Sequence, residues 1–429
     1  MELKIKNIGM IHSAELNVDG ISVVTGNNDS GKSTIGKALF SLCHGIQSYE
    51  KKIEADAMEY IGEDFYNVMK AVGRIDAEDA PASLSRMRIR HRGLLLVRKY
   101  GVDNIEKEIE KIENMKFDGN DVIDINDSIA ILKGKLHEIH SDEFLDMVKK
   151  RTIERVFRSE FSKNVNNVYS EDIGEVIVGE NNRFVKVGFK NNKLIKLDGE
   201  LASSDGLQGA FPEVNFINTP FVLDDINNVR CFYDDVYTHK GDLISKLLGD
   251  EQDESNVIEY ALKDEEKTIV EEAIAKVLAG NVIKKQGFFY QQNGKEFSID
   301  TLATGMKTYV VIKMLLDNGY LRPNSLLILD EPEVHLHPSW QLLFAELLVL
   351  FYKELGIKVL LATHSPYFLQ AIEAYSKKYE IQEKTHFYLS KKHGDSAVLE
   401  NIDNDLEQTY KLMAEPILIL QSMQDELEV

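Results

Sequence analysis

The chain has 429 residues, of which 43% are hydrophobic and 28% are charged. This length allows a large core and predicts two or three structural units. Acidic residues outnumber basic ones by 71 to 50, which gives a formal net charge of -21. That balance excludes a protein that binds DNA over its whole surface, because phosphate contacts require clustered Lys and Arg, although it is compatible with a local basic patch.

The composition also indicates the compartment. The chain has 2 cysteines, Cys43 and Cys231, which is too few for a disulfide framework or a zinc site. The first residues are charged and alternate like a strand, unlike a signal peptide. No apolar run reaches the roughly 18 residues that a membrane span needs. We therefore expect a cytoplasmic protein with no membrane partner, in which Cys43 serves packing.

The start of the chain has the pattern of a phosphate-binding domain. Leu3–Ile8 and Ala14–Val18 alternate apolar and polar residues, which predicts a hairpin at the edge of a sheet. Ile21–Thr25 is predicted to be a buried strand and Thr34–His44 a helix. Between them, residues 26–33 are Gly-Asn-Asn-Asp-Ser-Gly-Lys-Ser, so the strand, glycine-rich loop and helix follow each other as a P-loop requires.

Each residue type in this loop suits a nucleotide phosphate. Gly26 and Gly31 allow the backbone to wrap the phosphates, and the helix N-terminus offers free N–H groups. Lys32 is expected to reach the β- and γ-phosphates, and the Ser33 hydroxyl to ligate Mg²⁺. The predicted nucleotide-binding residues of the loop are Gly26, Asn27, Asn28, Ser30, Gly31, Lys32, Ser33 and Thr34.

A charged, mainly helical insertion is predicted over residues 45–170. It contains two basic groups in an otherwise acidic chain. The first is Arg86, Arg88, Arg90, His91, Arg92, Arg98 and Lys99, and the second is Lys149, Lys150, Arg151, Arg155, Arg158 and Lys163. Nucleic acid or an acidic protein surface could bind them. The pattern favours a solvated helix face with internal ion pairs, since no aromatic residues are interleaved for base stacking.

Residues 171–210 are predicted to form a small antiparallel β segment and a loop. Glu175–Val178, Phe184–Phe189 and Leu194–Leu197 are short strands separated by Asn-Asn turns. Leu201–Phe211 is rich in Ser and Gly, which predicts a loop.

Residues 211–429 are predicted to complete the nucleotide-binding domain. Buried strands are expected at Val214–Ile217, Leu326–Asp330 and Lys358–Ala362, with a helix from Leu302 to about Asn318 in which Thr304 and Gly305 occupy the N-cap region. Further expected elements are helices at Leu243–Leu248, Ser255–Leu278, Ser339–Lys353 and Tyr367–Tyr379, a hairpin from Phe288–Gln291 and Glu296–Ile299, one tail strand at His386–Ser390, and a largely helical Asp403–Leu427.

Two of these strands end in polar residues. Asp330 and Glu331 follow one apolar run, and Thr363-His364-Ser365 follows another. The carboxyl ends of parallel strands form the ligand-binding edge of an open α/β sheet. One acid there can hold Mg²⁺ and the next can polarise a water molecule for attack on a phosphate. His335 and His337 have no third ligand nearby, so we expect structural roles for them.

Taken in order, the P-loop, Leu302-Ala-Thr-Gly-Met-Lys307, Leu327-Ile-Leu-Asp-Glu-Pro332 and Thr363-His-Ser365 resemble the ABC-type ATPase heads of SMC, RecF and OLD-family proteins. Asp330–Pro338 and Thr363–Phe368 are similar to a narrower group, the AAA-21-type bacterial ATPases, many of which belong to anti-phage defence systems such as Septu. The resemblance covers about residues 1–44 and 210–429. It implies an α/β P-loop NTPase fold, with a mixed sheet flanked by helices and a mainly helical insertion.

The resemblance implies ATP and Mg²⁺ as cofactors and a role for each motif. Asp330 would complete the Mg²⁺ shell with Ser33, Glu331 would activate the attacking water, and His364 would contact the γ-phosphate. The signature segment, with Ala303, Thr304 and Gly305, would act on the nucleotide held by a second copy, so that a homodimer encloses two ATP molecules. The family's signature has Ser at the position of Ala303, a change that favours slow turnover; Thr304 or backbone N–H groups could replace the lost contact. Asn218 and Thr219 are the only candidates for a glutamine loop.

We therefore expect an ATP-binding and ATP-hydrolysing regulatory subunit of a bacterial anti-phage defence complex. The tail after His364 is too short for the nuclease domain of many OLD-family proteins, so a separately encoded effector, with a nuclease as the expected class, would be the partner. One alternative is a DNA-binding repair ATPase resembling SMC and RecF, with DNA as the partner of the basic groups. Another is an ATP-stabilised scaffold with little turnover. An ABC transporter subunit fits less well.

Overall fold

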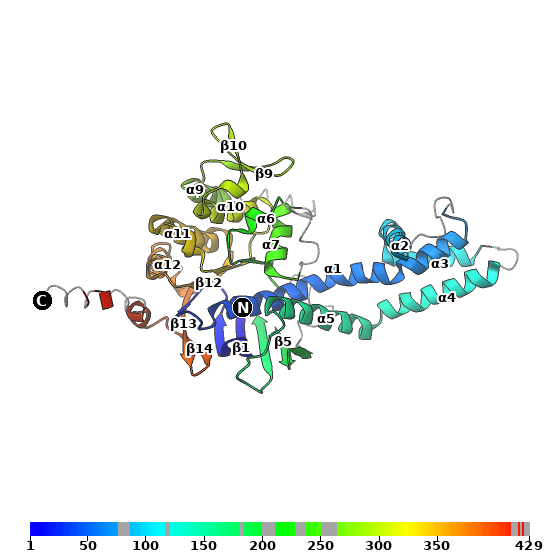
Figure 1. Ribbon diagram of the computed structural model, residues 1–429, viewed down its shortest axis with the longest axis horizontal. Helices are drawn as coiled ribbons and strands as arrows, with labels where there is room; N and C mark the ends of the chain where they lie inside the picture. Colours follow the sequence, from blue (N-terminus) through cyan, green and yellow to red (C-terminus); the bar gives the residue numbers. More distant parts are fainter. Residues whose placement is uncertain are drawn as a thin grey trace. The chain divides into compact units, whose positions relative to one another are not determined.

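The structure, a computed structural model, describes residues 1–75, 86–115, 121–180, 183–199, 211–227, 237–249, 264–412, 419–420 and 423 (Figure 1). The predicted loop at Leu201–Phe211 lies almost entirely outside these residues, as do parts of the predicted helices at Ser255–Leu278 and Asp403–Leu427. The chain divides into two compact units, one formed by Met1–Gly45 with Glu154–Val429 and the other by Ile46–Ile153.

An 11-stranded mixed sheet organises the larger unit within the described residues. Its strands are β1 (Glu2–Ile8), β2 (Ile11–Asn17), β3 (Ile21–Gly26), β4 (Gly174–Glu180), β5 (Arg183–Lys190), β6 (Lys193–Asp198), β7 (Val214–Ile217), β11 (Leu326–Asp330), β12 (Lys358–Thr363), β13 (Thr385–His393) and β14 (Ser396–Asn401). Across the sheet they follow the order β6-β5-β4-β1-β2-β14-β13-β3-β12-β11-β7.

Five neighbouring strands, β13, β3, β12, β11 and β7, are parallel to one another. Every residue of β3, β7 and β12 is buried, as expected for parallel strands that are covered on both faces. The predictions of buried strands at these positions are confirmed. Because the five strands run in the same direction, the P-loop, the two acids and the Thr-His-Ser segment all follow strands that end at one edge.

The hairpin of β1 and β2 does not lie at the edge of the sheet, so that prediction was wrong. β1 pairs with β4, and β2 pairs in parallel with β14. The alternating burial of β1 reflects one covered face of an interior strand, and such alternation does not distinguish an interior strand from an edge strand. The prediction of a single tail strand was also wrong, because β13 turns back into the shorter strand β14.

Helices cover both faces of the parallel strands. Besides the helix that follows the P-loop, described below, the larger unit contains α6 (Val222–Asp225), α7 (His239–Leu248), α9 (Asp264–Ala275), α10 (Thr304–Asp317), α11 (Pro338–Leu355) and α12 (Pro366–Lys378), with 3₁₀ turns η5 (Ile299–Thr301), η6 (Pro332–His335) and η7 (Gln382–Lys384). Leu327, Leu329 and Leu361 share one core cluster with α10, α11 and α12, which gather on one side of the sheet in Figure 1. Ile328 and Phe216 point to the opposite face.

That opposite face is covered by the first part of α1 (Lys32–Ala71). A Cβ on Gly36 would lie 3.0 Å from Cγ2 of Ile328, and the rings of Phe40 and Phe216 are 6.0 Å apart. The larger unit also contains a small antiparallel sheet of β8 (Asn281–Lys284), β9 (Phe288–Gln292) and β10 (Lys295–Ser298), which confirms the predicted hairpin.

The smaller unit is helical. It contains the remainder of α1, α2 (Arg86–Tyr100), α3 (Val102–Glu113), α4 (Asp121–Ile139) and the start of α5 (Asp142–Glu160). Its own core has Phe65, Ile109, Ile112, Leu132 and Leu136 fully or almost fully buried. Among the described helices, none combines the length and apolar character needed to cross a membrane.

Candidate nucleotide-binding site

The glycine-rich loop connects β3 to α1, and both of its glycines are sterically required. Gly26 has φ +148° and Gly31 has φ +84°, in the region that favours glycine. A Cβ on Gly26 would lie 2.4 Å from the carbonyl oxygen of Ser390, and a Cβ on Gly31 would lie 2.6 Å from Cδ1 of Ile11. The backbone of this loop is therefore packed against β13 and β2 in a shape that only glycine permits.

Lys32 lies buried at the centre of this loop. Its Nζ donates to the carbonyl oxygens of Gly26 at 3.1 Å and Asn27 at 2.8 Å. Burial lowers the pKa of Lys32, and the charges of Glu331 and Asp330 oppose that effect. The ammonium group is thus held between the loop carbonyls and the acids that follow β11, where it would meet a bound phosphate.

The other predicted loop residues differ in their exposure. Asn27 and Asn28 are exposed, whereas Ser30 is buried and its carbonyl accepts a hydrogen bond of 2.5 Å from the Ser390 hydroxyl. Thr34 lies beside the hairpin turn, because a Cβ on Gly9 would meet its Cγ2 at 3.0 Å.

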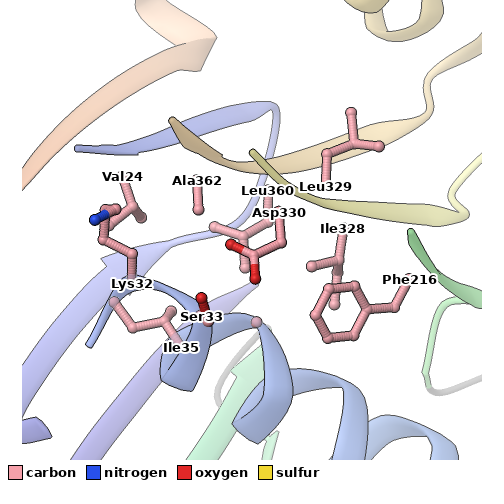
Figure 2. A pocket seen from close by; sticks show the side chains of 11 residues that line it. Val24, Lys32, Ser33, Ile35, Phe216, Ile328, Leu329, Asp330, Leu360 and Ala362 are labelled. Atoms are coloured by element: carbon pink, nitrogen blue, oxygen red, sulfur yellow. The ribbon is translucent and has the colours of Figure 1, made fainter. Parts of the chain in front are cut away.

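Ser33 and Asp330 face each other across a small pocket, as Figure 2 shows. Burial raises the pKa of Asp330, and the Ser33 hydroxyl opposes that shift in part by hydrogen bonding. Asp330 Oδ1 is buried and has no hydrogen-bond partner among the described residues. One hydroxyl and one orphaned carboxylate oxygen fit Mg²⁺, which prefers oxygen ligands and takes the rest from phosphates and water.

No group of three or more His, Cys, Asp or Glu side chains in the described part of the chain could hold a metal ion by itself. His337 has a structural contact, because its Nδ1 accepts a 3.3 Å hydrogen bond from the backbone N–H of Ser339 and so caps α11. The ring of His335 lies edge-on to Phe221 at 5.1 Å. Cys43 is fully buried, and burial raises the pKa of its thiol to about 12.

Glu331 has an unusual backbone conformation for a glutamate. Its φ is +49°, in the left-handed region, and its N–H donates to the carbonyl of Ala362 at 2.9 Å. Non-glycine residues adopt this conformation at a cost that the surrounding structure must offset, and such residues gather at functional sites. The conformation directs the carboxylate toward β12, where Glu331 Oε1 lies 2.7 Å from Nε2 of His364.

His364 follows the end of β12 and is only partly exposed. Burial is the main effect that lowers its pKa, and the nearby charge of Lys32 lowers it further, whereas Glu331 raises it. The imidazole is therefore neutral at neutral pH. Because an ionised carboxylate only accepts hydrogen bonds, Nε2 must be the protonated nitrogen that donates to Glu331.

The signature segment starts α10, which begins two residues after the predicted Leu302, and its N-cap lies one residue before the predicted N-cap region. Ala303 is the N-cap residue and gives no side-chain hydrogen bond, and Thr304 is the first helical residue. A Cβ on Gly305 would lie 3.1 Å from the carbonyl oxygen of His335, so this helix start is packed against η6. Lys307 is buried and forms an ion pair with Asp224.

The structure thus joins Lys32, Ser33, Asp330, Glu331 and His364 in one site. In the described part of the chain, no hydrogen bond or ion pair connects Ala303, Thr304 or Gly305 to the P-loop. The glutamine-loop candidates do not join the site either: Asn218 is exposed, and Thr219 Oγ1 accepts from the N–H of Phe221 at 3.3 Å.

Sequence reasoning missed Glu333. This residue lies in η6, is 5% exposed, and contacts the segment that carries His364. A third acid so close to Asp330 and Glu331 was the available signal, but a Pro-Glu pair before a helix also fits an ordinary turn.

These features define the class of the protein, a P-loop ATPase with a mixed α/β sheet flanked by helices and interrupted by a helical unit. The sequence profile of the AAA ATPase domain family matches residues 1–369, and the chain belongs to that family.

The chain is also similar to solved SMC head domains, and no curated protein matches it. The SMC head domain from Thermotoga maritima is 11% identical, with a TM-score of 0.40 over 94% of this chain and 98% of that one. An Smc head with an extended coiled coil from Pyrococcus furiosus, bound to the C-terminal domain of ScpA, is 12% identical, with a TM-score of 0.41 over 96% and 98%. An SmcHead bound to the C-winged helix domain of ScpA is 10% identical, with a TM-score of 0.47 over 95% and 98%.

Proposed function

We propose that this protein binds ATP with Mg²⁺ and hydrolyses it to ADP and phosphate. The observation that carries the proposal is the convergence of Lys32, Ser33, Asp330, Glu331 and His364 at the carboxyl edge of β3, β11 and β12. A phosphate-binding loop, a Mg²⁺-type donor pair and an acid directed by a neutral histidine are the components that γ-phosphoryl transfer to water requires.

Each side chain has a defined part in this reaction. Lys32 would exchange its bonds to the Gly26 and Asn27 carbonyls for the β- and γ-phosphates. Ser33 and Asp330 would hold Mg²⁺, which when bound supplies charge neutralisation at the phosphate oxygens. Glu331 would accept a hydrogen bond from the attacking water and orient it toward the γ-phosphorus.

His364 has two possible states in this scheme. In the structure its Nε2–H is directed to Glu331. With nucleotide present, the same N–H group could donate to a γ-phosphate oxygen and free the Glu331 carboxylate for water. A neutral imidazole suits both contacts, because one nitrogen always donates.

We further propose that two copies enclose the nucleotides. The start of α10 has no side-chain cap, so its first N–H groups are available to a γ-phosphate held by another copy. Val334, on η6 beside the site, is 60% exposed, and Tyr367, at the start of α12, is 59% exposed. Large apolar side chains at the rim of a site favour its burial by a partner surface.

The regulatory role in anti-phage defence belongs to the same proposal and is supported by the motif resemblance of Asp330–Pro338 and Thr363–Phe368. In this role ATP-dependent dimerisation would control a separately encoded effector, with a nuclease as the expected class. The nucleotide can set the state of the assembly only if it binds the closed dimer more tightly than the open one.

The DNA-binding alternative has less support from the described side chains. Lys150 pairs with Asp146 at 2.8 Å and Arg158 pairs with Glu154 at 3.3 Å. The guanidinium of Arg155 lies over the ring of Tyr237 at 3.9 Å, and Lys149 is buried. These intramolecular contacts favour the interpretation of the second basic group as a paired helix face. In the first basic group, the side chains of Arg86, Arg88, Arg90 and His91 lie outside the described residues.

Phosphate release tests hydrolysis directly. Wild-type protein, Lys32→Ala and Glu331→Gln would be compared with Glu383→Gln, which changes an exposed acid on η7. We expect Glu331→Gln to bind ATP normally but to release phosphate about 100-fold more slowly, the scale of general-base loss. Lys32→Ala should lose nucleotide binding, and Glu383→Gln should match the wild type.

The scaffold reading is the second candidate, and Ala303 at the N-cap of α10 favours it, because a hydroxyl that could contact the γ-phosphate is absent there. Equal, very slow phosphate release by wild type and Glu331→Gln, with ATP retained by both, would replace the hydrolytic proposal with this one.

A further inference from the structure

Glu333 lies directly beneath the segment that holds His364. Its side chain is buried, and one oxygen, Oε1, accepts three hydrogen bonds from consecutive residues. The donors are the Thr363 hydroxyl at 2.5 Å, the His364 N–H at 2.8 Å and the Ser365 N–H at 3.2 Å. A single carboxyl oxygen therefore contacts the backbone on both sides of the His364 Cα, and it shares the Ser365 N–H with the Thr363 hydroxyl, which accepts at 3.1 Å.

A second side chain, Gln341 on α11, holds the same segment from the other direction. Its Nε2 donates to the carbonyl oxygens of Glu333 at 3.3 Å and Leu336 at 3.2 Å, and its Oε1 accepts from the Ser365 hydroxyl at 2.8 Å. Ser365 in turn accepts from the N–H of Phe368 at 3.2 Å and caps α12. Glu333 thus stands at the centre of a network that joins η6, α11 and the start of α12.

The position of His364 makes such support necessary. His364 follows the last residue of β12, and its N–H takes Glu333 as its partner instead of another strand. A buried N–H without a partner is costly, and a carboxyl oxygen can accept several donors at once. The conformation of Glu331, whose Oε1 meets His364 Nε2, is fixed separately through its N–H bond to Ala362.

We propose that Glu333 is the positioning residue for His364, which it holds by the backbone so that the imidazole reaches both Glu331 and the γ-phosphate position. This inference rests on the proposed ATPase function and adds a residue to it. In this proposal Glu333 acts only through the placement of His364 and has no direct part in the reaction.

The chain offers a matched control for the loss of a buried carboxylate. Glu346 on α11 is 7% exposed and is bound by Lys378 at 2.8 Å and by the Tyr379 hydroxyl at 2.6 Å. It shares the helix of Gln341 but belongs to a different network. Glu346→Gln therefore measures how the loss of another buried carboxylate in this part of the core affects exchange and kcat.

Two measurements on the full chain test the proposal. Hydrogen exchange of the peptide that covers residues 363–365, without nucleotide, reports whether Glu333 holds the two amides. Steady-state phosphate release, with ATP affinity measured separately, reports the effect on kcat and on binding. The variants are Glu333→Ala, Glu333→Gln and Glu346→Gln, with wild type and Glu331→Gln as references.

We expect Glu333→Ala to accelerate exchange at residues 363–365 and to lower kcat by about 100-fold, the scale reported for a misplacement of about 1 Å, with ATP affinity changed less than about threefold. Glu333→Gln keeps an acceptor oxygen, so it should restore part of the protection and part of kcat. Glu346→Gln should leave both unchanged.

Two results would overturn the proposal: unchanged exchange at 363–365 in Glu333→Ala, or faster exchange with a wild-type kcat. If the wild type turns over no faster than Glu331→Gln, the proposed hydrolysis fails on its own account. The exchange data then test the positioning role of Glu333 by themselves. Faster exchange at residues 363–365 in Glu333→Ala would support that role, and unchanged exchange would reject it.

Discussion

At the scale of single residues, Asp330, the proposed Mg²⁺ ligand, shows what it costs to bury a carboxylate oxygen without a partner. The Ser33 hydroxyl satisfies the carboxylate only in part, and Oδ1 is buried without a partner in the described structure. Burial raises the pKa of Asp330, which means that the folded state binds its proton more tightly than the unfolded state. Stability therefore falls as pH rises from the ordinary pKa of an aspartate toward the raised pKa of Asp330.

Asp330→Asn should remove this penalty. We expect the variant to raise the unfolding free energy of the nucleotide-free protein by about 1 kcal/mol, the scale of one unsatisfied buried polar group. It should also lose the thermal stabilisation that ATP with Mg²⁺ gives the wild type. Thermal unfolding with and without nucleotide measures both effects, with Asp395→Asn as an exposed control. A nucleotide-free Asp330→Asn protein less stable than wild type would contradict this account.

The environment of His364 predicts how its imidazole titrates. Burial and Lys32 lower its pKa below the ordinary 6.5, so we expect an NMR titration of its imidazole to give a midpoint below that value. Because the unfolded chain binds this proton more readily, the His364 contribution to stability is lost as pH falls from 6.5 through the lowered pKa. Glu331 opposes the shift, so Glu331→Gln should lower the midpoint further. A midpoint that rises in Glu331→Gln would show that the pair seen in the structure does not form in solution.

At the scale of elements, the parallel strands and the P-loop could be predicted because their signals are local. A run such as Leu326–Leu329 is too short and too apolar for anything but a buried strand, and the glycines of the loop are needed at their own positions. The motifs predicted that Lys32, Ser33 and Asp330 lie together, and the structure places the three around one pocket. Their chemical roles stay predictions.

Features that depend on partners distant in the chain could not be predicted. The edge position of β1 and β2 was wrong because their neighbours, β4 and β14, come from residues far along the sequence. Glu333 was missed for the same reason, since its partners are about 30 residues away and its burial has no local signal. The start of α10 was shifted because Ala303 is not a typical N-cap residue.

At the scale of the whole molecule, the sheet brings the two halves of the site together. β3 pairs with β12 so that Thr25 lies opposite Thr363, and β12 pairs with β11 so that Ala362 lies opposite Asp330. The P-loop, the two acids and His364 therefore lie directly after the ends of three adjacent strands. In the sequence, residues 46–153, which form the separate helical unit, stand between the P-loop and the other two segments.

We propose that ATP links two copies of the chain through this site, and the mass of the purified chain in solution measures whether it does. The mass would be measured without nucleotide, with ATP and Mg²⁺, and with ADP, for wild type, Glu331→Gln and Lys32→Ala. We expect a dimer or larger oligomer only with ATP. It should persist in Glu331→Gln and be absent in Lys32→Ala. An oligomer of constant mass in all three nucleotide states would contradict this proposal.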